Sequence, residues 1–480
     1  MKNGLESSGP AGSSTASDSN TLKTPELSAP LKTPLFQKPV CIASFSYDAE
    51  RGLHHDNRAL SVFHDPPPPR WESGAERGRG GMRGPNLNYG FERWRRRDES
   101  IDEHLDSLLF ALQHKTSAVG ASASSAAEAD RDRARADVIT WRGIATKLCT
   151  AVFAESGNDA WELNAMQVGN TIYLEEYVAP ASRRDRATST DQRLLGFMYN
   201  GYAFESFCTS PALLERDAPI ASSSSTAFAT DKQPPGWGGD INNNVQWCAL
   251  CKTTLGSNRL ILGGEVDCIR PAAVAKLSTG SYDKSDTQAL HASPVLSPDD
   301  FVELKTSAEI RGARDVERFE GTKMLRFYFQ SFLLGVPTIV TGFRDRAGHL
   351  ADVKHLNTLQ LPRTVRERHP LLDAGKGLAF AQQIISWVRS HTAANAPAVW
   401  PEQEEGEASF PVFRIAFVPT GAASSFSSRN SSMYGGTLSI RRLTDEEVRE
   451  DIKGGSASGR VGFLPTSYYN FAKERLIQPQ

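Results

Sequence analysis

The sequence lacks any apolar run long enough to cross a membrane, and it lacks an excess of charge of either sign. Its longest apolar stretch, residues 327–343, is shorter than the ~20 residues of a spanning helix and is interrupted by Gln330 and Pro337. Lys and Arg together number 54 and Asp and Glu 56, which gives a net charge of −2. We therefore expect no membrane partner and no uniformly basic surface, although this balance permits a local basic channel.

Signals for secretion and for disulfide bonding are also missing. Residues 1–20 contain no apolar segment of the kind that a signal peptide requires. The cysteines are scattered through apolar segments, as in a reduced intracellular protein, at Cys41, Cys149, Cys208, Cys248, Cys251 and Cys268. The composition thus predicts the cytoplasm or the nucleus without choosing between them.

Histidine is absent between His114 and His291. This gap excludes a general-base histidine and a histidine-based zinc site from the middle of the chain. Cys248 and Cys251 have C-x-x-C spacing, but no second pair or histidine follows at zinc-finger distance. In a strand these two thiols would face opposite sides, so we interpret them as packing residues.

The rest of the composition is that of a globular protein. Apolar residues make up 39% of the 480 residues, enough for a sizeable core. Residues 1–34, rich in Ser, Thr, Gly and Pro, are predicted to be disordered, and residues 35–480 to form one domain. That domain contains low-complexity insertions after Pro66, at 118–137, at 222–239 and near Ser424.

Helical and strand patterns are mixed along the chain. Apolar residues recur at helical spacing within 98–113, 140–153 and 315–334. Strand-like patterns occupy 170–178, 258–269, 301–306, 411–419 and 437–443. This mixture favours a single mixed α/β domain, with mixed sheets flanked by helices.

Residues 301–306, FVELKT, place an acid and a base inside an apolar pattern. Alternation along a strand puts Glu303 and Lys305 on the same face. Charges of this kind cost free energy in a buried strand unless something there uses them. Taken alone, the motif is explained most simply by an ion pair at a sheet edge, so its meaning depends on its surroundings.

A second strand pattern, NRLILGGEVDCI, carries further acids. The same alternation puts Gly263, Glu265 and Asp267 on one face, and Gly264 leaves further space beside them. If this strand is a neighbour of FVELKT, three carboxylates and one ammonium group converge. Three carboxylates that close cannot all remain ionised without added positive charge.

Hard divalent cations can supply that charge. Mg²⁺ and Mn²⁺ prefer carboxylate, carbonyl and water oxygens, and two ions about 3.5–4 Å apart serve phosphoryl chemistry. The order acid, acid-x-acid, Glu-x-Lys resembles the PD-(D/E)xK nuclease core. Glu205, expected to head a helix in GYAFESFC, is a candidate fourth acid, and Lys323 and Gln330 are expected to point at the strands from one helix edge.

Several motifs, in this order, resemble the DXO-type RNA 5′-end decapping nucleases. They are CIASFSYDAERG, RDESIDEHLDSLL, TWRGIATKL, LLGFMYNGYAFE, NNNVQWCALCKTTLGSNRLILGGEVD, FVELKT and FQSFLLGVPTIVTGFRD. The resemblance covers about residues 41–346, and NNNVQWC and the Ser-rich insertions look most like the fungal nuclear branch. Members of that branch bind and stabilise a nuclear Xrn-type 5′–3′ exoribonuclease, so the resemblance implies that partner and a nuclear location.

The resemblance also implies roles for individual residues. The metal ligands it implies are Glu205, Glu265, Asp267, Glu303 and the main-chain carbonyl of Leu304. Two further catalytic residues, which would hold the attacking water and the scissile phosphate, are Lys305 and Gln330. Besides Glu265, Lys305 and Gln330, the implied substrate contacts are Arg51, Glu103, Trp141, Arg142, Gly143 and Cys248.

The expected reaction is hydrolysis of a phosphoric anhydride or phosphodiester at the 5′ end of RNA, in 5′-end quality control, with Mg²⁺ or Mn²⁺ as cofactor. Expected substrates are triphosphorylated ends and incompletely or non-canonically capped RNA. Two alternatives stay open: a mainly non-catalytic stabilising partner of the exoribonuclease, and a DNA-directed nuclease on the same core. A glycosidase built on paired acids would need neither metal nor Lys305.

Overall fold

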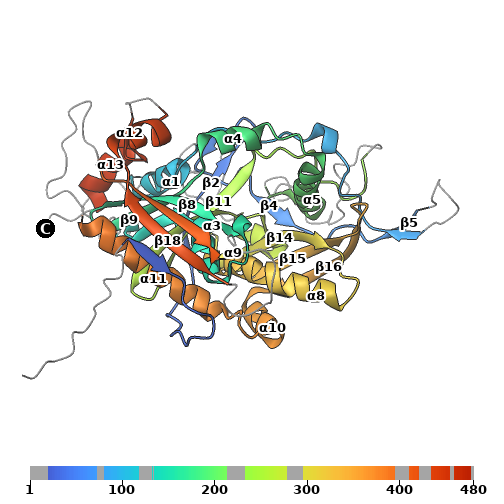
Figure 1. Cartoon of the computed structure of the whole chain (residues 1–480). Helices are drawn as coiled ribbons and strands as arrows, with labels where there is room; N and C mark the ends of the chain where they lie inside the picture. Colours follow the sequence, from blue (N-terminus) through green and yellow to red (C-terminus); the bar gives the residue numbers. More distant parts are fainter. Residues whose placement is uncertain are drawn as a thin grey trace, which may run out of the picture.

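Two β-sheets form the framework of the chain, and helices pack against their faces (Figure 1). The computed structural model describes residues 20–72, 81–117, 132, 134–212, 233–277, 296–394, 410–420, 434–454 and 459–476. The mixed α/β class expected from the sequence is confirmed. Within these ranges, no helix has both the length and the apolar character that crossing a bilayer requires.

The larger sheet draws its strands from both ends of the described chain. Its ten strands are ordered β1 (Thr21–Lys23), β18 (Gly436–Arg442), β17 (Phe413–Pro419), β8 (Trp161–Val168), β9 (Thr171–Tyr177), β7 (Val138–Trp141), β12 (Asn258–Glu265), β11 (Gln246–Leu255), β2 (Val40–Tyr47) and β3 (Leu53–His54). Only β7 lies parallel to its neighbours among the described strands of this sheet. The strands expected at 411–419 and 437–443 are β17 and β18, which pair with each other.

The smaller sheet contains the FVELKT motif. Its six strands are ordered β10 (Thr209–Pro211), β4 (Ser61–Phe63), β13 (Cys268–Ile269), β14 (Phe301–Ala308), β15 (Thr338–Arg344) and β16 (Leu350–Asn357). β14 is parallel to β15 and antiparallel to β13. Two hairpins stand apart, β5 (Arg70–Glu72) with β6 (Gly81–Arg83) and β19 (Arg460–Val461) with β20 (Leu464–Pro465).

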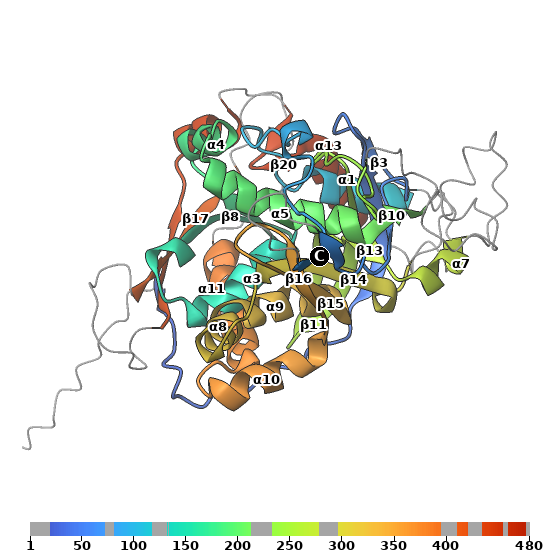
Figure 2. The same ribbon diagram turned by 90° about the vertical axis from the view of Figure 1, so that its right-hand side faces the viewer.

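The helices sort into layers around the two sheets. They are α1 (Asp106–Ser117), α3 (Arg142–Thr150), α4 (Pro180–Ala187), α5 (Gln192–Cys208), α7 (Val274–Leu277), α8 (Ala313–Arg318), α9 (Leu325–Leu334), α10 (Leu361–Arg368), α11 (Ala374–Ala394), α12 (Asp445–Glu447) and α13 (Thr466–Phe471). One apolar cluster joins α3, α9 and α11 to both sheets, and a second packs α1 and α13 on the larger sheet. A third cluster packs α5 on the smaller sheet, which α5 crosses in Figure 2.

Side-chain alternation along β14 explains how a strand with charged residues is accommodated. Val302 and Leu304 pack against α5, whereas Phe301 joins the cluster that contains α9. Because successive side chains of a strand point to opposite faces, Glu303 and Lys305 share the face of Phe301. The charged pair therefore points away from α5 and toward the space between the two sheets.

The helix expected at 98–113 starts later than predicted. α1 begins at Asp106, and Ile101, assigned to the helix by its spacing, is 62% exposed. His104 adopts a φ of +47°, which is incompatible with a right-handed helix at that position. The expected helix at 315–334 is interrupted as well, because Phe319–Met324 forms a π-helical segment between α8 and α9.

The ordered fold also begins before residue 35. Disorder was expected for residues 1–34; residues 1–19 lie outside the described residues, but residues 20–34 contain β1. β1 pairs antiparallel with β18, and the Leu27 side chain is 1% exposed. A local excess of Ser, Thr and Pro could not reveal this segment, because its partner strand lies near the other end of the chain.

Leu27 provides a test of this N-terminal packing. We expect Leu27→Ala to lower the free energy of unfolding by roughly 2–5 kcal/mol, because a buried leucine loses its contacts and leaves a cavity. Urea denaturation measures this change. Leu35→Ala is the matched control: Leu35 is 85% exposed, so its loss should change stability by no more than about 0.5 kcal/mol. Equal effects would contradict the packing.

Candidate active site

The chain crosses from the larger to the smaller sheet at the candidate site. β12 ends at Glu265, residues 266–267 belong to no strand, and β13 pairs with β14. The strand pattern at 258–269 is therefore divided between two sheets, and only its last part, β13, is a neighbour of β14. The crossing still leaves Asp267 beside β14, where its Oδ2 accepts a 2.6 Å hydrogen bond from the Leu304 backbone N–H.

Glu303 is held in the interior by two cations. It is 1% exposed; its Oε2 accepts a 2.8 Å hydrogen bond from Arg142, and its Oε1 one of 2.5 Å from Lys305. Burial by itself would raise the pKa of Glu303, but the two cations lower it to about 2. Glu303, Arg142 and Lys305 thus form a buried ion triad with an ionised carboxylate at its centre.

Glu205, Glu265 and Asp267 are half-buried around this triad. Burial, together with the negative charge of Glu303, raises the pKa of Asp267 to about 7. Burial also raises the pKa of Glu265, despite the opposing effect of Arg142, and burial and Asp267 raise that of Glu205 well above its usual value. If all four acids were ionised, their negative charge would exceed the positive charge of Arg142 and Lys305, and the raised pKa values show that the fold without a metal ion favours the protonated forms of Glu205, Glu265 and Asp267.

Glu205 reaches the site from a different part of its helix than expected. It lies near the C-terminal end of α5, whose N-cap is Asp191, and does not head a separate helix. Phe204 and Phe207 are buried, as their spacing predicted. At the other end of the site, Lys323 donates a 3.1 Å hydrogen bond to Ser307.

The residues at the site fit a hard divalent cation by their chemistry. All four acids offer oxygen donors, and the Leu304 carbonyl would add a fifth. In the described part of the chain, no three His, Cys, Asp or Glu side chains already form a closed ligand group. Both Glu303 oxygens contact cations, so a metal ion would share this carboxylate with Arg142 and Lys305 or displace one of them from it.

A pocket of about 440 Å³, the first pocket, opens on one side of the acids and is lined by five of the sequence-predicted residues: Arg51, Glu103, Trp141, Cys248 and Glu265. Arg51 binds both carboxylate oxygens of Glu103 at 2.7 Å and donates a 2.5 Å hydrogen bond to Gln246. Gln246 in turn donates a 3.0 Å hydrogen bond to Glu265. This chain of contacts links the first pocket to the acids.

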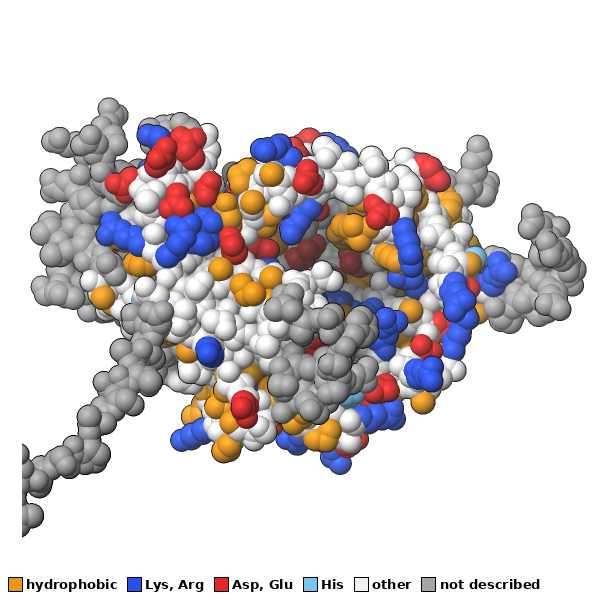
Figure 3. Space-filling model, viewed as in Figure 1, with side chains coloured by type: hydrophobic (Ala, Val, Ile, Leu, Met, Phe, Trp, Pro, Cys, Tyr) orange, Lys and Arg blue, Asp and Glu red, His pale blue; other side chains and the backbone are white. Residues whose placement is uncertain are grey.

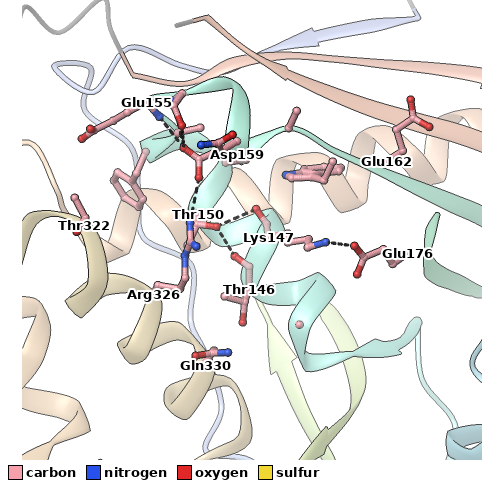
Figure 4. A pocket seen from close by; sticks show the side chains of 18 of the residues that line it. Thr146, Lys147, Thr150, Glu155, Asp159, Glu162, Glu176, Thr322, Arg326 and Gln330 are labelled. Atoms are coloured by element: carbon pink, nitrogen blue, oxygen red, sulfur yellow. Dashed lines mark hydrogen bonds and ion pairs between the residues drawn. The ribbon is translucent and has the colours of Figure 1, made fainter. Parts of the chain in front are cut away.

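A larger pocket of about 950 Å³, the second pocket, lies next to the first and shares Glu176, Val178 and Arg186 with it; it is drawn in Figure 4. Gly143 and Gln330 line it, so seven of the nine predicted substrate residues line one of the two pockets, whereas Arg142 and Lys305 line neither. On the face shown in Figure 3 the molecule is hollowed near its middle, with acidic side chains inside the hollow and Lys and Arg side chains at its rim.

Two glycines in β12 make room for the side chains of the site, and a cysteine in β11 lies beside the acids. A Cβ on Gly264 would lie 2.7 Å from Leu334 and 3.1 Å from the Arg142 side chain, and one on Gly263 would lie 3.0 Å from the Trp141 ring. The close approach of Trp141 and Arg142 therefore requires glycine in β12. Cys248 lies opposite Glu265 in the β11–β12 register, which places this thiol beside the acids.

Gln246, His104 and Glu175 are among the residues of the first pocket that sequence reasoning missed. Gln246 shares a strand face with Cys248, so alternation in VQWC offered a signal. His104 and Glu175 offered none, because they are 71 positions apart; their 2.8 Å contact is buried. The main-chain carbonyl of His104 also accepts a hydrogen bond from the Trp141 indole N–H. Among the described non-glycine residues, only His104 and Arg51 have a positive φ.

Acids ordered acid-x-acid and Glu-x-Lys, gathered where two helix-flanked sheets meet, are the arrangement expected of a nuclease of the PD-(D/E)xK class. The family model described as "RAI1 like PD-(D/E)XK nuclease" matches residues 37–446, and the chain belongs to this family. The family expected from the sequence motifs is thereby confirmed.

Individual relatives agree with this assignment. The chain is 36% identical over 92% of its length to the decapping nuclease RAI1 of Mycosarcoma maydis, covering 89% of that protein. It is 30% identical over 76% of its length to the human decapping and exoribonuclease protein, covering 78% of it. The solved Rai1 of Candida albicans in complex with pU5-Mn²⁺ shares the fold, with a TM-score of 0.61 at 20% identity, covering 94% of this chain and 99% of that one.

The buried pair of His104 and Glu175 should make stability depend on pH. Burial lowers the pKa of His104, but Glu175 more than offsets this and raises it above 6.5. The contribution of the protonated imidazole is therefore complete below pH 6.5, the ordinary pKa, and is lost as the pH rises through the higher folded pKa. We expect the free energy of unfolding to fall across that window.

Urea denaturation at several pH values measures this fall. The control is the double variant His104→Asn/Glu175→Gln, which removes both titrating groups, while asparagine tolerates the positive φ. Its curve should be flatter above pH 6.5 than that of the unaltered protein. Parallel curves for the two proteins would contradict a charged His104–Glu175 pair.

Proposed function

We propose that the chain is a divalent-metal-dependent hydrolase of RNA 5′ ends. The observation that carries the proposal is the gathering of Glu205, Glu265 and Asp267 around the triad of Glu303, Arg142 and Lys305, beside two adjacent pockets. Oxygen donors in this number suit two ions of Mg²⁺ or Mn²⁺. Residues 35–480 would act as one catalytic domain.

The residues of the chain would bind and orient the reacting phosphate. When bound, divalent cations would supply the charge that lowers the pKa of water and stabilises the leaving oxygen. Lys305, fixed by Glu303, would hold a phosphate oxygen, and Gln330 would orient the attacking water from α9. Gly143 leaves the N-terminus of α3 open, since a Cβ there would meet nothing within 4 Å, and helix N-termini favour anions.

The proposed substrates are triphosphorylated RNA ends and incompletely or non-canonically capped RNA. The names of the relatives support this, since they are decapping nucleases and a decapping exoribonuclease. The Candida albicans neighbour was solved with pU5 and Mn²⁺, an RNA and a metal ion of the proposed classes. We also propose a nuclear location and a nuclear Xrn-type exoribonuclease as partner, supported by the sequence resemblance to the fungal nuclear branch.

Substitution of Asp267 tests whether this residue serves catalysis or the stability of the fold. We expect Asp267→Asn to lower kcat on 5′-triphosphorylated RNA by about 10²-fold or more, because charge stabilisation in the transition state is lost. Its free energy of unfolding without metal should not fall at about pH 8, because ionised Asp267 there costs free energy. Product analysis with end-labelled RNA and urea denaturation measure the two effects.

Asp299→Asn is the matched control, because Asp299 is half-exposed and pairs with Lys38 away from the acids. Unchanged hydrolysis by the Asp267 variant would remove that residue from the mechanism. Equal cleavage of RNA and matched single-stranded DNA would favour the DNA-directed alternative. Hydrolysis that persists after EDTA treatment would exclude a metal-dependent reaction.

A further experiment separates catalysis from partner binding. We expect Asp267→Asn to co-purify with the nuclear exoribonuclease as well as the unaltered chain does, because Asp267 is half-buried among the acids of the site and the substitution keeps its size. Pull-down from nuclear extract, followed by assay of the bound exoribonuclease, measures this. Loss of the complex in this variant, with Asp299→Asn still bound, would mean that the acid site itself forms the partner interface.

A further inference from the structure

A group of cations and one exposed aromatic ring lies beside the second pocket. Three members define it, which we call the mouth cluster: Phe197 of α5, Lys323 of the π-helical segment and Arg344 at the end of β15. Arg193 and Arg318 lie at its margins, the first 5.7 Å from the Phe197 ring and the second close enough to lower the pKa of Lys323. Its members thus come from three separate segments.

The mouth cluster follows the acid site along β14. Glu303, Lys305 and Ser307 share one face of this strand, and the Lys323 Nζ donates a 3.1 Å hydrogen bond to Ser307. Ser307 lies four positions along the strand from Glu303, a span of roughly 13 Å. Lys323 also lines the second pocket, together with Gln330. A ligand longer than one phosphate group can therefore reach from the acids to this cluster.

The cations of the mouth cluster differ from their neighbours in having no acidic partner. Elsewhere in the second pocket, Lys147 pairs with Glu176 at 2.5 Å and Arg326 with Asp159 at 3.1 Å. Among the described residues, no carboxylate pairs with Lys323 or Arg344, and the buried Nε of Arg344 has no hydrogen-bond acceptor. Burial and the charge of Arg344 lower the pKa of Lys323, as burial lowers that of Arg344. An anionic ligand would offset this repulsion.

Phe197 adds a flat surface to these charges. Its side chain is 48% exposed, and the Arg344 guanidinium carbon lies 4.8 Å from the ring centre. Leu194, one turn earlier on α5, is 51% exposed. Proteins that bind single-stranded nucleic acid combine positive charge that follows the backbone with aromatic rings on which bases stack. Phe197 and its flanking cations have both properties.

The first pocket is a poorer place for a polyanion. Six carboxylates line it, on Glu99, Asp102, Glu103, Glu175, Glu176 and Glu265, against the four guanidinium groups of Arg51, Arg97, Arg183 and Arg186. Arg51 and Arg183 already pair with Glu103 and Asp102. The second pocket is less acidic, with the four carboxylates of Glu155, Asp159, Glu162 and Glu176 against the four cations of Lys147, Arg186, Lys323 and Arg326. A nucleic acid chain leaving the acid site is therefore repelled less on the side of the second pocket and the mouth cluster.

We propose that the mouth cluster binds the RNA chain on the 3′ side of the reacting phosphate, with bases stacked on Phe197 and phosphates held by Lys323 and Arg344. This inference rests on the proposed function, because it assumes that the reacting 5′ end lies at the acids. It adds a subsite that makes turnover depend on chain length. An acidic segment of a protein partner is the competing occupant and is an outcome of the test.

The test compares two 5′-triphosphorylated RNAs, a dinucleotide and a chain of about 20 nucleotides. For Lys323→Ala/Arg344→Ala, kcat/KM should fall about 10-fold on the long RNA and less than about 2-fold on the dinucleotide. Binding of 5′-monophosphorylated oligo(U) to this variant in EDTA should also have a log–log salt slope shallower by roughly 1.4, about 0.7 per lost phosphate contact. Phe197→Leu, which keeps an apolar side chain, should weaken oligo(U) binding about 5-fold or more.

Arg363→Ala is the control, because Arg363 is an exposed arginine on α10 paired with Glu367. Equal losses on both RNAs, or no loss on either, would overturn the inference. Retained RNA binding with lost co-purification of the exoribonuclease would assign the cluster to a protein partner. If the unaltered chain hydrolyses neither RNA, the proposed function fails, and oligo(U) binding still decides the inference by itself.

Discussion

The structure depends on keeping the ionised Glu303 carboxylate in its interior. Removing one partner of a buried ion pair typically costs about 3–5 kcal/mol, so Arg142 and Lys305 must both contact it. Arg142 is the first residue of α3 and follows β7 of the larger sheet, whereas Glu303 and Lys305 belong to β14 of the smaller sheet. The ion triad therefore also joins the two sheets, and the acids of the site lie at this junction.

The acids at this junction could be predicted because their pattern is local. Alternation in FVELKT identifies the residues that share a face with Glu303, and it requires no knowledge of neighbouring strands. The sheet to which a strand belongs is not a local property. Residues 266–267 leave the larger sheet, and only the pairing of β13 with β14 shows where Asp267 then lies. The position of Glu205 likewise depends on Asp191, which starts its helix well before the motif.

The walls of the first pocket were less predictable, because distant contacts stabilise them. Arg51 and His104 both adopt positive φ, which costs of order 1–3 kcal/mol at a non-glycine residue. Arg51 is held by Glu103 and His104 by Glu175, across 52 and 71 positions of sequence. Periodicity cannot mark such residues, and so the pattern predicted a helix that runs through His104. β1 was not predicted because it also depends on a distant contact: its hydrogen-bonding partner is β18, near the other end of the chain.

Unequal distribution of charge explains how a chain with a net charge of −2 could act on a polyanion. Without divalent cations, a phosphate near the acids would be repelled by the carboxylates that are ionised, and its own charge would raise the pKa values of Glu205 and Asp267 further. Lys323 and Arg344 would attract the same molecule at the rim with or without metal. Metal ions would therefore determine whether the 5′ end enters the acid site. The mouth cluster would determine whether the rest of the RNA chain stays bound. Affinity for RNA and catalytic turnover are thus separable properties of this fold, because different residues carry them.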